Sequence, residues 1–510
     1  MEAEGAVAGD RTRGYRYDSI QSPCWRRQGC RDRQTGNGGG LANTGGGKPT
    51  MTTLARQIAE RIHALRYEDI TPEAHEWTAS AFVDTVACTL AGIQEEGPQI
   101  LMRVPGVAAA PGPALIHGTN RRTSVLDAAL VNGTASHALD YDDVAGSMGG
   151  HPSVMLIPAL IPLAEMLGSS GRDLVIAYVV GFETECRIGR GVHHHHYEKG
   201  WHPTATLGIF GTVAGAARLM HLSVEQTAVA LGMAASFAAG LKANFGTMTK
   251  PLHVGHGIRD GLFAALMAKE GYTANPGALE HKQGFLDVFN GPGTYDTARI
   301  LNDWYTPIEC GGAGDPGLKP YPCCGSTHPS IGRAIELATR HDLKPEQIER
   351  ITVLPHARRL PHTNNPNPTT PLGAKFSMQY CVARALVDRS VKLSDFEGDA
   401  PYDPTVRGLM KRLEARPHPD MPEDWGTEVI VETTDGQRFA SRLDDYPSRG
   451  PAGDPMTHAE LWTKFADCAG RSLPRAGLSG LFDTLMGIAA LPVVHDLTAM
   501  LQPGTGSRAA

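Results

Sequence analysis

The sequence predicts a mainly α-helical protein, with a large all-helical domain into which a smaller α+β lid domain is inserted. Helical periodicity and helix-capping residues dominate the chain before residue 318, where almost no segment alternates between apolar and polar residues. Strand-like segments and a hairpin turn follow in the next part of the chain. The tail then returns to a purely helical pattern, which makes the α+β part an insertion.

The domain boundaries are expected where these patterns change. Residues 1–50 carry Arg, Gln, Asn and Gly and lack an apolar stretch, so a disordered leader is expected, with Met51 as an alternative start. The other boundaries place the first part of the helical domain at 51–317, the α+β domain at 318–452, the helical return at 453–502 and a tail at 503–510.

Helix start and stop signals mark the elements of the helical domain. Thr71, Pro72 and Glu73 supply an N-cap, a proline at the first helical position and an acid in the first turn. A helix is therefore expected to begin there and to end at Gly92. Further helices are expected at 126–139, 158–167, 173–189 and 258–271.

The stretch at 200–257 holds two apolar helices rich in Gly and Ala. The first is expected at 206–220, and the second at 223–241, where Ser223 and Gln226 form a capping box. Their larger apolar residues are spread around the helix, which is typical of buried helices. Cationic side chains lie at their ends, and an unpaired buried charge is costly, so these ends are expected to face a cleft.

The α+β part shows two strand signals. The segment at 348–357, IERITVLPHA, is expected to be a helix end followed by a strand. The segment TEVIVETTDGQRFASRL is expected to be a hairpin that turns at Asp435 and Gly436. Helices are expected at 376–387 and 402–413, and in the tail at 458–470 and 480–491.

Composition restricts the class of partner. The 510 residues are 41% hydrophobic and 20% charged, with a formal net charge of −7, so neither a nucleic-acid footprint nor a polybasic membrane patch is present. No apolar run reaches the length of a membrane span. The nine cysteines include no CxxC pair, which favours reduced thiols in a cytoplasmic protein. A small-molecule partner is expected.

An acidic turn follows one of the apolar helices. The segment at 137–152, HALDYDDVAGSMGGHP, places three carboxylates beside two histidines and several glycines. A solvated loop and a metal site are both alternatives, but the ligand pattern of a metal site is thin. The functional interpretation is an acid/base pair of Asp140 and His151 at the wall of a cleft.

Cationic and imidazole side chains recur in three further segments. WHP contributes His202, TKPLHVGHG contributes Lys250 and His253, and LKPYPCCGSTH contributes Lys319. No matching acids are apparent nearby in the sequence, and this excess of positive charge suits a polyanionic substrate. Each segment alone is equally consistent with a helix cap.

Three other features have competing interpretations. Tyr380 lies on an expected helix. It is either a core residue or a phenol that donates a hydrogen bond into the cleft. The histidine run at 193–196 is expected to be a polar loop rather than a metal site. The GAGDPG segment at 312–317 matches GxGxxG, but no strand precedes it, so a turn is expected.

Taken in order, several of these motifs resemble the MmgE/PrpD family. The motifs are HALDYDD, HPSV, GWHPT, TKPLHVG, GFLDVF, KPYPCC, KFSMQY and GDPMTHAELWTKF, and the resemblance covers about residues 52 to 500. It implies a large helical domain with a smaller α+β domain, usually in a dimer, and proton transfer at carbon on a di- or tricarboxylate without a redox cofactor. That family includes 2-methylcitrate dehydratases, cis-aconitate decarboxylases and an iminodisuccinate epimerase.

The resemblance to the decarboxylase branch also implies site residues. These are Asp140, His151, His202, Lys250, Lys319 and Tyr380. The chain departs from that branch at Val144, where a threonine is expected, at Cys324, where a histidine is expected, and by one extra residue before His151.

The expected function is that of a cofactor-independent lyase, without metal, acting on a small di- or tricarboxylate. Asp140, His151, His202 and Tyr380 are the expected catalytic residues, and Lys250, Lys319 and His253 are expected to bind substrate carboxylates. A dicarboxylate epimerase or isomerase is one alternative, and a non-catalytic carboxylate-binding dimer is another. A homodimer is expected in either case, because small-residue helices pack closely across a two-fold axis.

Overall fold

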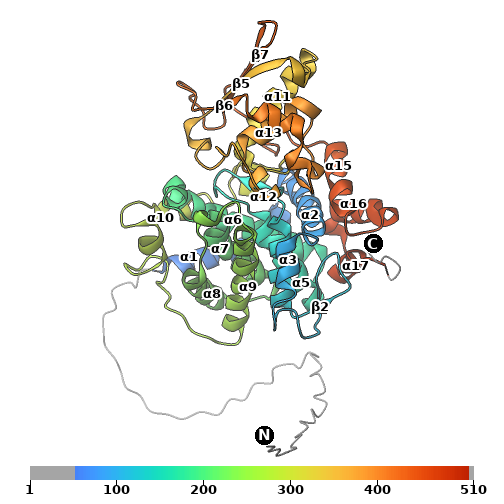
Figure 1. The fold of residues 1–510 in the computed structure, drawn as a ribbon. Helices are drawn as coiled ribbons and strands as arrows, with labels where there is room; N and C mark the ends of the chain where they lie inside the picture. Colours follow the sequence, from blue (N-terminus) through green and yellow to red (C-terminus); the bar gives the residue numbers. More distant parts are fainter. Residues whose placement is uncertain (1–51, 505–510) are drawn as a thin grey trace, which may run out of the picture. The chain divides into compact units, whose positions relative to one another are not determined.

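The computed structural model describes residues 52–504, and the fold is mainly α-helical as predicted (Figure 1). The expected leader at 1–50, the alternative start at Met51 and the end of the tail lie outside the described residues. Within residues 52–504, no helix combines the length and the apolar character that crossing a membrane requires.

Ten α-helices lie before residue 318 in the part of the chain that the structure describes. Their bounds are α1 Leu54–Ala64, α2 Pro72–Gly92, α3 Glu96–Leu101, α4 Val125–His137, α5 Ser153–Leu167, α6 Gly171–Glu198, α7 Pro203–Leu219, α8 Val224–Phe237, α9 Thr249–Lys269 and α10 Thr297–Leu301. Two antiparallel pairs of very short strands accompany them, β1 Ala114–Leu115 with β2 Arg122–Thr123, and β3 Val144–Ala145 with β4 Pro316–Gly317.

Glycines let the central helices approach closely. A Cβ atom at Gly211 of α7 would lie 2.5 Å from Oε2 of Glu185 and 2.8 Å from the carbonyl oxygen of Gly181, both on α6. A Cβ atom at Gly255 of α9 would lie 2.3 Å from the carbonyl oxygen of Leu130 on α4. Side chains larger than hydrogen would push these helix pairs apart, so the small residues set the packing of the helical core.

Local capping signals are confirmed. The hydroxyl of Thr71 accepts a hydrogen bond from the amide of Ala74 at the start of α2, and Pro72 is the first helical residue. Ser223 and Gln226 form the expected capping box at the start of α8. These caps satisfy amides that have no partner within the helix, which is why they can be found from sequence alone.

Several helix bounds differ from the expectation, and three of these differences have a local reason. The helix α5 begins at Ser153, and Pro158 lies inside it, because its buried apolar face continues through the proline. The helix α9 begins at Thr249 rather than at 258, since Pro251 lies in a first turn where no amide partner is required. The histidine run belongs to α6 and not to a loop, with a kink at His193 (φ 52°, ψ −163°).

The α+β part contains a four-stranded sheet with the order β6-β5-β7-β8. The strands β5 (Ile348–Pro355) and β6 (Leu413–Ala415) are parallel, and β7 (Thr427–Thr433) and β8 (Arg438–Leu443) complete the sheet antiparallel. The expected hairpin at Asp435 and Gly436 is confirmed. The expected helix end at Ile348 is wrong, because β5 already begins there and only a short 3-10 turn precedes it.

Helices α11 (His328–Arg340) and α13 (Met378–Asp388) pack against this sheet and enclose an apolar core of their own. Two further short helices lie between β5 and β6 along the chain, α12 (Pro371–Ala374) and α14 (Pro404–Met410). Figure 1 shows α11, α13 and the sheet together in its upper part.

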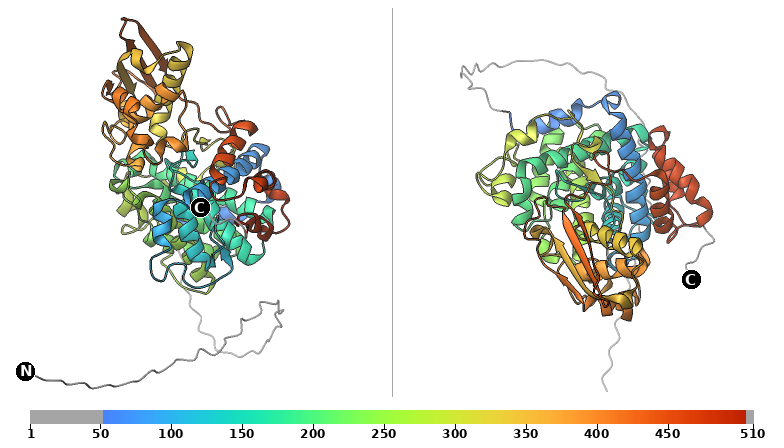
Figure 2. Two further views of the ribbon diagram at one scale, coloured as in Figure 1. Left: turned by 45° about the vertical axis from the view of Figure 1, so that its right-hand side comes forward. Right: turned by 90° about the horizontal axis from the view of Figure 1, so that it is seen from above.

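The tail forms α15 (His458–Ala469), α16 (Leu478–Met486) and α17 (Val494–Met500). Phe465 and Leu481 join the same apolar core as α2, and both views of Figure 2 show the tail helices beside α2. The last part of the chain therefore packs on α2. This packing places α15 near the site described below.

Candidate functional site

A cavity of about 500 Å³ gathers most of the side chains singled out in the sequence. His151, His202, Lys250 and Lys319 line it, together with Asp140. The α+β part contributes a further set of lining side chains, including Ser326, Arg358, Arg359, His362, Phe376 and Trp425.

Short local structures bring these side chains to the cavity. Asp140 follows the end of α4 in a left-handed conformation, with a φ of 53°. The pairing of β3 with β4 carries Lys319 to the turn that holds Asp140. His202 precedes the first residue of α7, and Lys250 lies in the first turn of α9, so both are presented by helix N-termini.

Asp140 is held by two lysines. Its Oδ1 atom lies 2.6 Å from Nζ of Lys250 and 2.9 Å from Nζ of Lys319, and all three residues are buried. Burial alone would raise the pKa of Asp140, but the two ammonium groups outweigh it and hold this pKa well below its usual range. No acid lies near these lysines in the sequence, but Asp140, which is 110 or more positions away from each of them, pairs with both.

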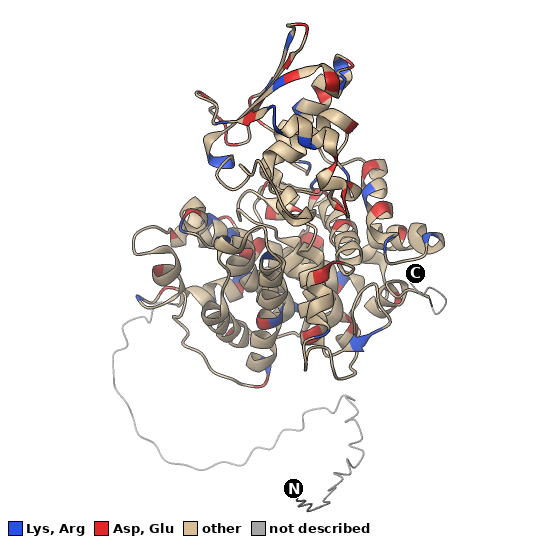
Figure 3. Cartoon of the chain, viewed as in Figure 1, with Lys and Arg blue, Asp and Glu red and all other residues tan. Residues whose placement is uncertain are grey.

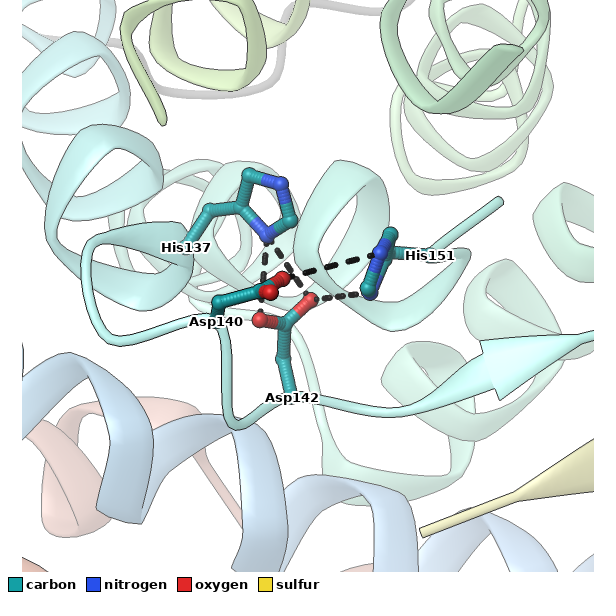
Figure 4. Close-up of side chains that lie close together, drawn as sticks. All are labelled: His137, Asp140, Asp142 and His151. Atoms are coloured by element: carbon teal, nitrogen blue, oxygen red, sulfur yellow. Dashed lines mark hydrogen bonds and ion pairs between the residues drawn. The ribbon is translucent and has the colours of Figure 1, made fainter. Parts of the chain in front are cut away.

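Asp142 lies between two histidines (Figure 4). One carboxylate oxygen, Oδ2, is 2.9 Å from Nδ1 of His137 and 2.9 Å from Nδ1 of His151. The Nδ1 atom of His151 also lies 2.8 Å from the carbonyl oxygen of Asp143. Because both neighbours are acceptors, this Nδ1 carries the proton, and the Nε2 atom is left as the basic nitrogen. That Nε2 lies 3.9 Å from Oδ1 of Asp140.

Burial keeps these imidazoles neutral. Desolvation lowers the pKa of His151 from 6.5, while Asp142 opposes the shift. Desolvation lowers the pKa of His137 to about 4. The pKa of Asp142 lies well below its usual range, because the two histidines and their hydrogen bonds outweigh the effect of burial. Near pH 7, Asp140 and Asp142 are therefore ionised, and His137 and His151 are neutral.

His202 and His253 contact each other through their Nδ1 atoms, which lie 3.2 Å apart. The Nε2 atom of His202 is buried without a hydrogen-bond partner, and this residue lines the cavity. Burial and then the charges of neighbouring groups lower the pKa of His202 well below 6.5. His253, which the sequence assigned to substrate binding, is not among the residues that line the cavity, and it contacts His202 instead.

Tyr380 lies apart from the other expected site residues. It is fully buried in the core of the α+β part, and its hydroxyl donates to the carbonyl oxygen of Asp395. It is absent from the cavity lining. Of the two interpretations of Tyr380, the structure supports the core residue.

Several residues at the site were not singled out in the sequence. His137 and Asp142 were visible only as members of the HALDYDD motif, with nothing to show which carboxylate faces which imidazole. His193 and His194, expected in a polar loop, line the cavity instead. Lys375, in the KFSMQY motif, is buried and donates to the carbonyl oxygen of Leu139.

The donor atoms of the acidic turn come close enough to surround a cation. His137, Asp140, Asp142 and His151 each offer one atom, and these atoms lie within 4.8 Å of one another. However, Oδ1 of Asp140 already binds two ammonium groups, whose charge repels a metal ion at this position. The cluster instead suits hydrogen-bonded acid/base chemistry.

Comparison with known proteins identifies the family. The model of the MmgE/PrpD N-terminal domain matches residues 56–298, and that of the MmgE/PrpD C-terminal domain matches residues 321–478. The chain belongs to the MmgE/PrpD family. The first match contains Asp140, His151, His202 and Lys250, whereas Lys319 lies in the short segment between the two matches.

Curated relatives of this MmgE/PrpD protein are similar over most of their length. A cis-aconitate decarboxylase of Mus musculus is 26% identical over 475 residues, which cover 89% of this chain and 94% of the relative. A cis-aconitate decarboxylase of Aspergillus terreus is 25% identical, with 88% and 96% covered. A 2-methylcitrate dehydratase of Salmonella typhimurium is 22% identical, with 77% and 85% covered.

Proposed function

We propose that this MmgE/PrpD protein is a lyase that acts on a small di- or tricarboxylate by acid/base proton transfer at carbon, without a redox cofactor. The observation that carries the proposal is the neutral His151, whose basic Nε2 lies 3.9 Å from a carboxylate bound by two lysines at the wall of a buried cavity. The relatives named above, decarboxylases and a dehydratase of tricarboxylates, support the same reaction class.

The charge of the cavity favours an anionic substrate. Cationic side chains outnumber carboxylates in the lining, with Arg190, Lys250, Arg299, Lys319, Arg358, Arg359 and Arg449 against Asp140, Asp315 and Asp424. Figure 3 shows both signs of charge interspersed over the described elements, whereas cations predominate among the residues that line the cavity. Desolvated cations bind carboxylates through charge-assisted hydrogen bonds.

Lys250 has the capacity to bind a substrate carboxylate as well as Asp140. An ammonium group has three donors. Among the described residues, Nζ of Lys250 donates to Oδ1 of Asp140 alone, whereas Nζ of Lys319 donates to both Oδ1 and the carbonyl oxygen of Asp140. A substrate carboxylate would therefore bind to the remaining donors of Lys250 while the hydrogen bond to Asp140 is kept.

The two imidazoles would move the protons. In a decarboxylation, the bond between carbon and the leaving carboxylate breaks and carbon dioxide departs. An imidazole that has taken a proton from solvent delivers it to the carbon that keeps the electron pair, and so returns to its neutral form. In a dehydration, one imidazole takes the proton from carbon, and a second group protonates the departing hydroxide. His151 and His202 both line the cavity, so the site offers two such groups.

The same pair of groups favours a second candidate, an epimerase of a dicarboxylate. The ring of His137 lies 4.6 Å from that of His151 and 5.7 Å from that of His202, so the two cavity imidazoles flank a common neighbour. If one imidazole removed a proton from one face of a carbon and the other, protonated beforehand, delivered a different proton to the opposite face, the carbon centre would be inverted. Epimerisation needs no loss of water or carbon dioxide, which separates it from the lyase reaction.

One experiment tests the proposal and distinguishes the alternatives. The purified, metal-free protein is incubated in D₂O with cis-aconitate, 2-methylcitrate and iminodisuccinate, and each reaction is followed by NMR. Loss of carbon dioxide or water supports the lyase, and deuterium incorporation without either supports the epimerase. Binding without any spectral change over days would favour a non-catalytic carboxylate-binding protein, and the absence of both binding and turnover would reject the proposal.

We also propose a homodimer. Large apolar side chains are exposed around α3 and the start of α9, including Ile100, Val104 and Met248, at 38%, 43% and 41%. Met248 lies near Gly97, because a Cβ atom at Gly97 would be 3.8 Å from that of Met248. Exposed apolar patches mark interaction surfaces. Light scattering at micromolar concentration is expected to give twice the 54.4 kDa chain mass, and a monomer only would reject the dimer.

A further inference from the structure

Three buried lysines bind three successive carbonyl groups of the acidic turn. The Nζ atom of Lys375 lies 2.6 Å from the carbonyl oxygen of Leu139, and that of Lys319 lies 2.8 Å from the carbonyl oxygen of Asp140. The Nζ atom of Lys464 lies 2.7 Å from the carbonyl oxygen of Tyr141. Each lysine thus donates a hydrogen bond to the backbone of one residue in the turn that presents the Asp140 carboxylate.

The three lysines come from distant parts of the chain. Lys319 follows β4, Lys375 is the C-cap of α12, and Lys464 lies on α15 in the tail. Their relative exposures are 3%, 5% and 5%. Lys464 also donates to the carbonyl oxygen of Lys319, at 3.0 Å, so it connects the two segments that carry Asp140 and Lys319.

The turn needs such support. Asp140 has a φ of 53°, in the left-handed region that residues with a side chain rarely adopt. Backbone conformations of this kind persist where the surroundings over-determine them. Here the residue with the unfavourable φ is the one whose carboxylate meets Lys250, Lys319 and the Nε2 side of His151.

We propose that Lys375 and Lys464 are positioning residues that hold the Leu139–Asp140–Tyr141 turn in the conformation in which Asp140 meets its lysines and His151. Neither lysine lines the cavity, so each acts through the backbone and not on the substrate. The effect on turnover rests on the proposed lyase function, whereas the effect on the turn itself does not.

A simpler account of Lys464 must be separated from this one. Its Nζ lies 2.5 Å from Oδ1 of the fully buried Asp84 on α2, so Lys464 also neutralises a buried carboxylate. If charge neutralisation were its only role, removal of both charges together would restore the protein, because no unpaired buried charge would remain. If Lys464 positions the turn, removal of both charges would restore stability, but the carbonyl oxygen of Tyr141 would still lack its hydrogen-bond donor.

The test compares Asp84→Asn, Lys464→Met and Asp84→Asn/Lys464→Met. Asp84→Asn keeps Lys464 as the donor to the carbonyl oxygen of Tyr141. This variant is therefore expected to retain kcat within about threefold of the wild type. Lys464→Met and the double variant are expected to lose about 10²-fold in kcat, the size of effect that a small misplacement of a catalytic group produces. The KM is expected to change much less, and thermal unfolding is expected to show that the double variant is more stable than Lys464→Met.

Hydrogen–deuterium exchange provides a readout that does not depend on activity. The peptide covering residues 138–145 is expected to exchange faster in the double variant and in Lys375→Met than in the wild type, with the rest of the protein unchanged. Lys242→Met is the matched control, because Nζ of Lys242 also donates to a backbone carbonyl, that of Tyr197, but outside the turn. This control is expected to leave the exchange of 138–145 unchanged.

The outcomes decide between the accounts. Wild-type kcat and wild-type exchange of 138–145 in the double variant would overturn the role of Lys464, and the same results in Lys375→Met would overturn that of Lys375. If the Lys464 variants do not fold, Lys375→Met decides whether backbone support from a lysine matters to the turn. If the wild-type protein turns over no polycarboxylate, the lyase proposal fails, while the exchange experiment still tests the positioning role.

Discussion

The Nδ1 atom of His151 lies 2.9 Å from Oδ2 of Asp142, in a pair where the imidazole reaches the cavity and the carboxylate does not. Asp142 therefore fixes the proton on the inner nitrogen of His151 and leaves the outer nitrogen basic. The same carboxylate oxygen contacts His137, so a single acidic side chain orients two rings. This relationship determines which nitrogen can take a proton from a substrate.

Asp142→Asn is expected to lower kcat on the order of 10² to 10⁴-fold, the usual contribution of a positioned proton-transfer group. The acidic limb of the pH profile of kcat/KM should also move to lower pH. Asp142 raises the pKa of His151 against the effect of burial, so its neutralisation lowers that pKa further. His151 is a base only above its pKa, and activity is lost as the pH falls through it.

Steady-state kinetics between pH 5 and 8 would measure both changes. Glu185→Gln is the matched control, since Glu185 is also a fully buried carboxyl, and burial raises its pKa well above the ordinary value. This control should retain wild-type kinetics. An Asp142→Asn enzyme with an unchanged kcat would show that His151 does not depend on Asp142.

Lys250 and His202 are expected to affect different kinetic constants. Lys250→Ala should mainly raise KM, roughly 10- to 100-fold, because a charge-assisted contact is worth about 1.5 to 3 kcal/mol. His202→Ala should mainly lower kcat, by removing a proton-transfer group. The exposed His256 lies on the same helix as Lys250, so His256→Ala is a suitable control. His193 cannot serve as one, because it lines the cavity.

Initial rates over a range of substrate concentrations, with matched circular dichroism melts, would separate these effects. Wild-type kcat/KM in both variants would show that neither Lys250 nor His202 acts on the substrate.

Sequence reasoning succeeded where the signal is local. The capping box of Ser223 and Gln226 is a pattern of neighbours, and the hairpin at Asp435 depends on two adjacent turn residues. The candidate site residues on short motifs also gather as a set, since Asp140, His151, His202, Lys250 and Lys319 all line one cavity.

Pairing between distant residues could not be predicted in the same way. Lys464 and Tyr141 are separated by 323 positions, and no periodicity in either segment indicates that they meet. The orientation of Tyr380 was equally inaccessible, because residues 378 to 386 of α13 are all buried and helical spacing then distinguishes no face.

Tyr380→Phe is expected to leave kcat and KM within about twofold of the wild type. The hydroxyl donates to the carbonyl oxygen of Asp395 inside the α+β core, so its loss should cost about 1 kcal/mol of unfolding free energy. Kinetics and urea unfolding of the two proteins would measure this. A tenfold or larger loss of kcat in a folded Tyr380→Phe protein would show that the phenol has a catalytic role.

His117 is expected to make the fold sensitive to acid. Both ring nitrogens are buried without hydrogen-bond partners, and burial lowers the pKa of this histidine to about 4 from 6.5. Because the pKa is lower in the folded protein, the unfolded chain binds the proton first. The stability contribution is therefore complete above pH 6.5 and is lost as the pH falls toward 4, by about 2 kcal/mol at pH 5.

His117→Leu removes this titration and the two unpartnered nitrogens. The difference in unfolding free energy between pH 7 and pH 5 should therefore be about 2 kcal/mol smaller in this variant than in the wild type. Urea unfolding at both pH values would measure it, with His221→Asn as the control because His221 is exposed. The control should keep the wild-type difference. If His117→Leu also kept it, another buried group would have to cause the loss of stability in acid.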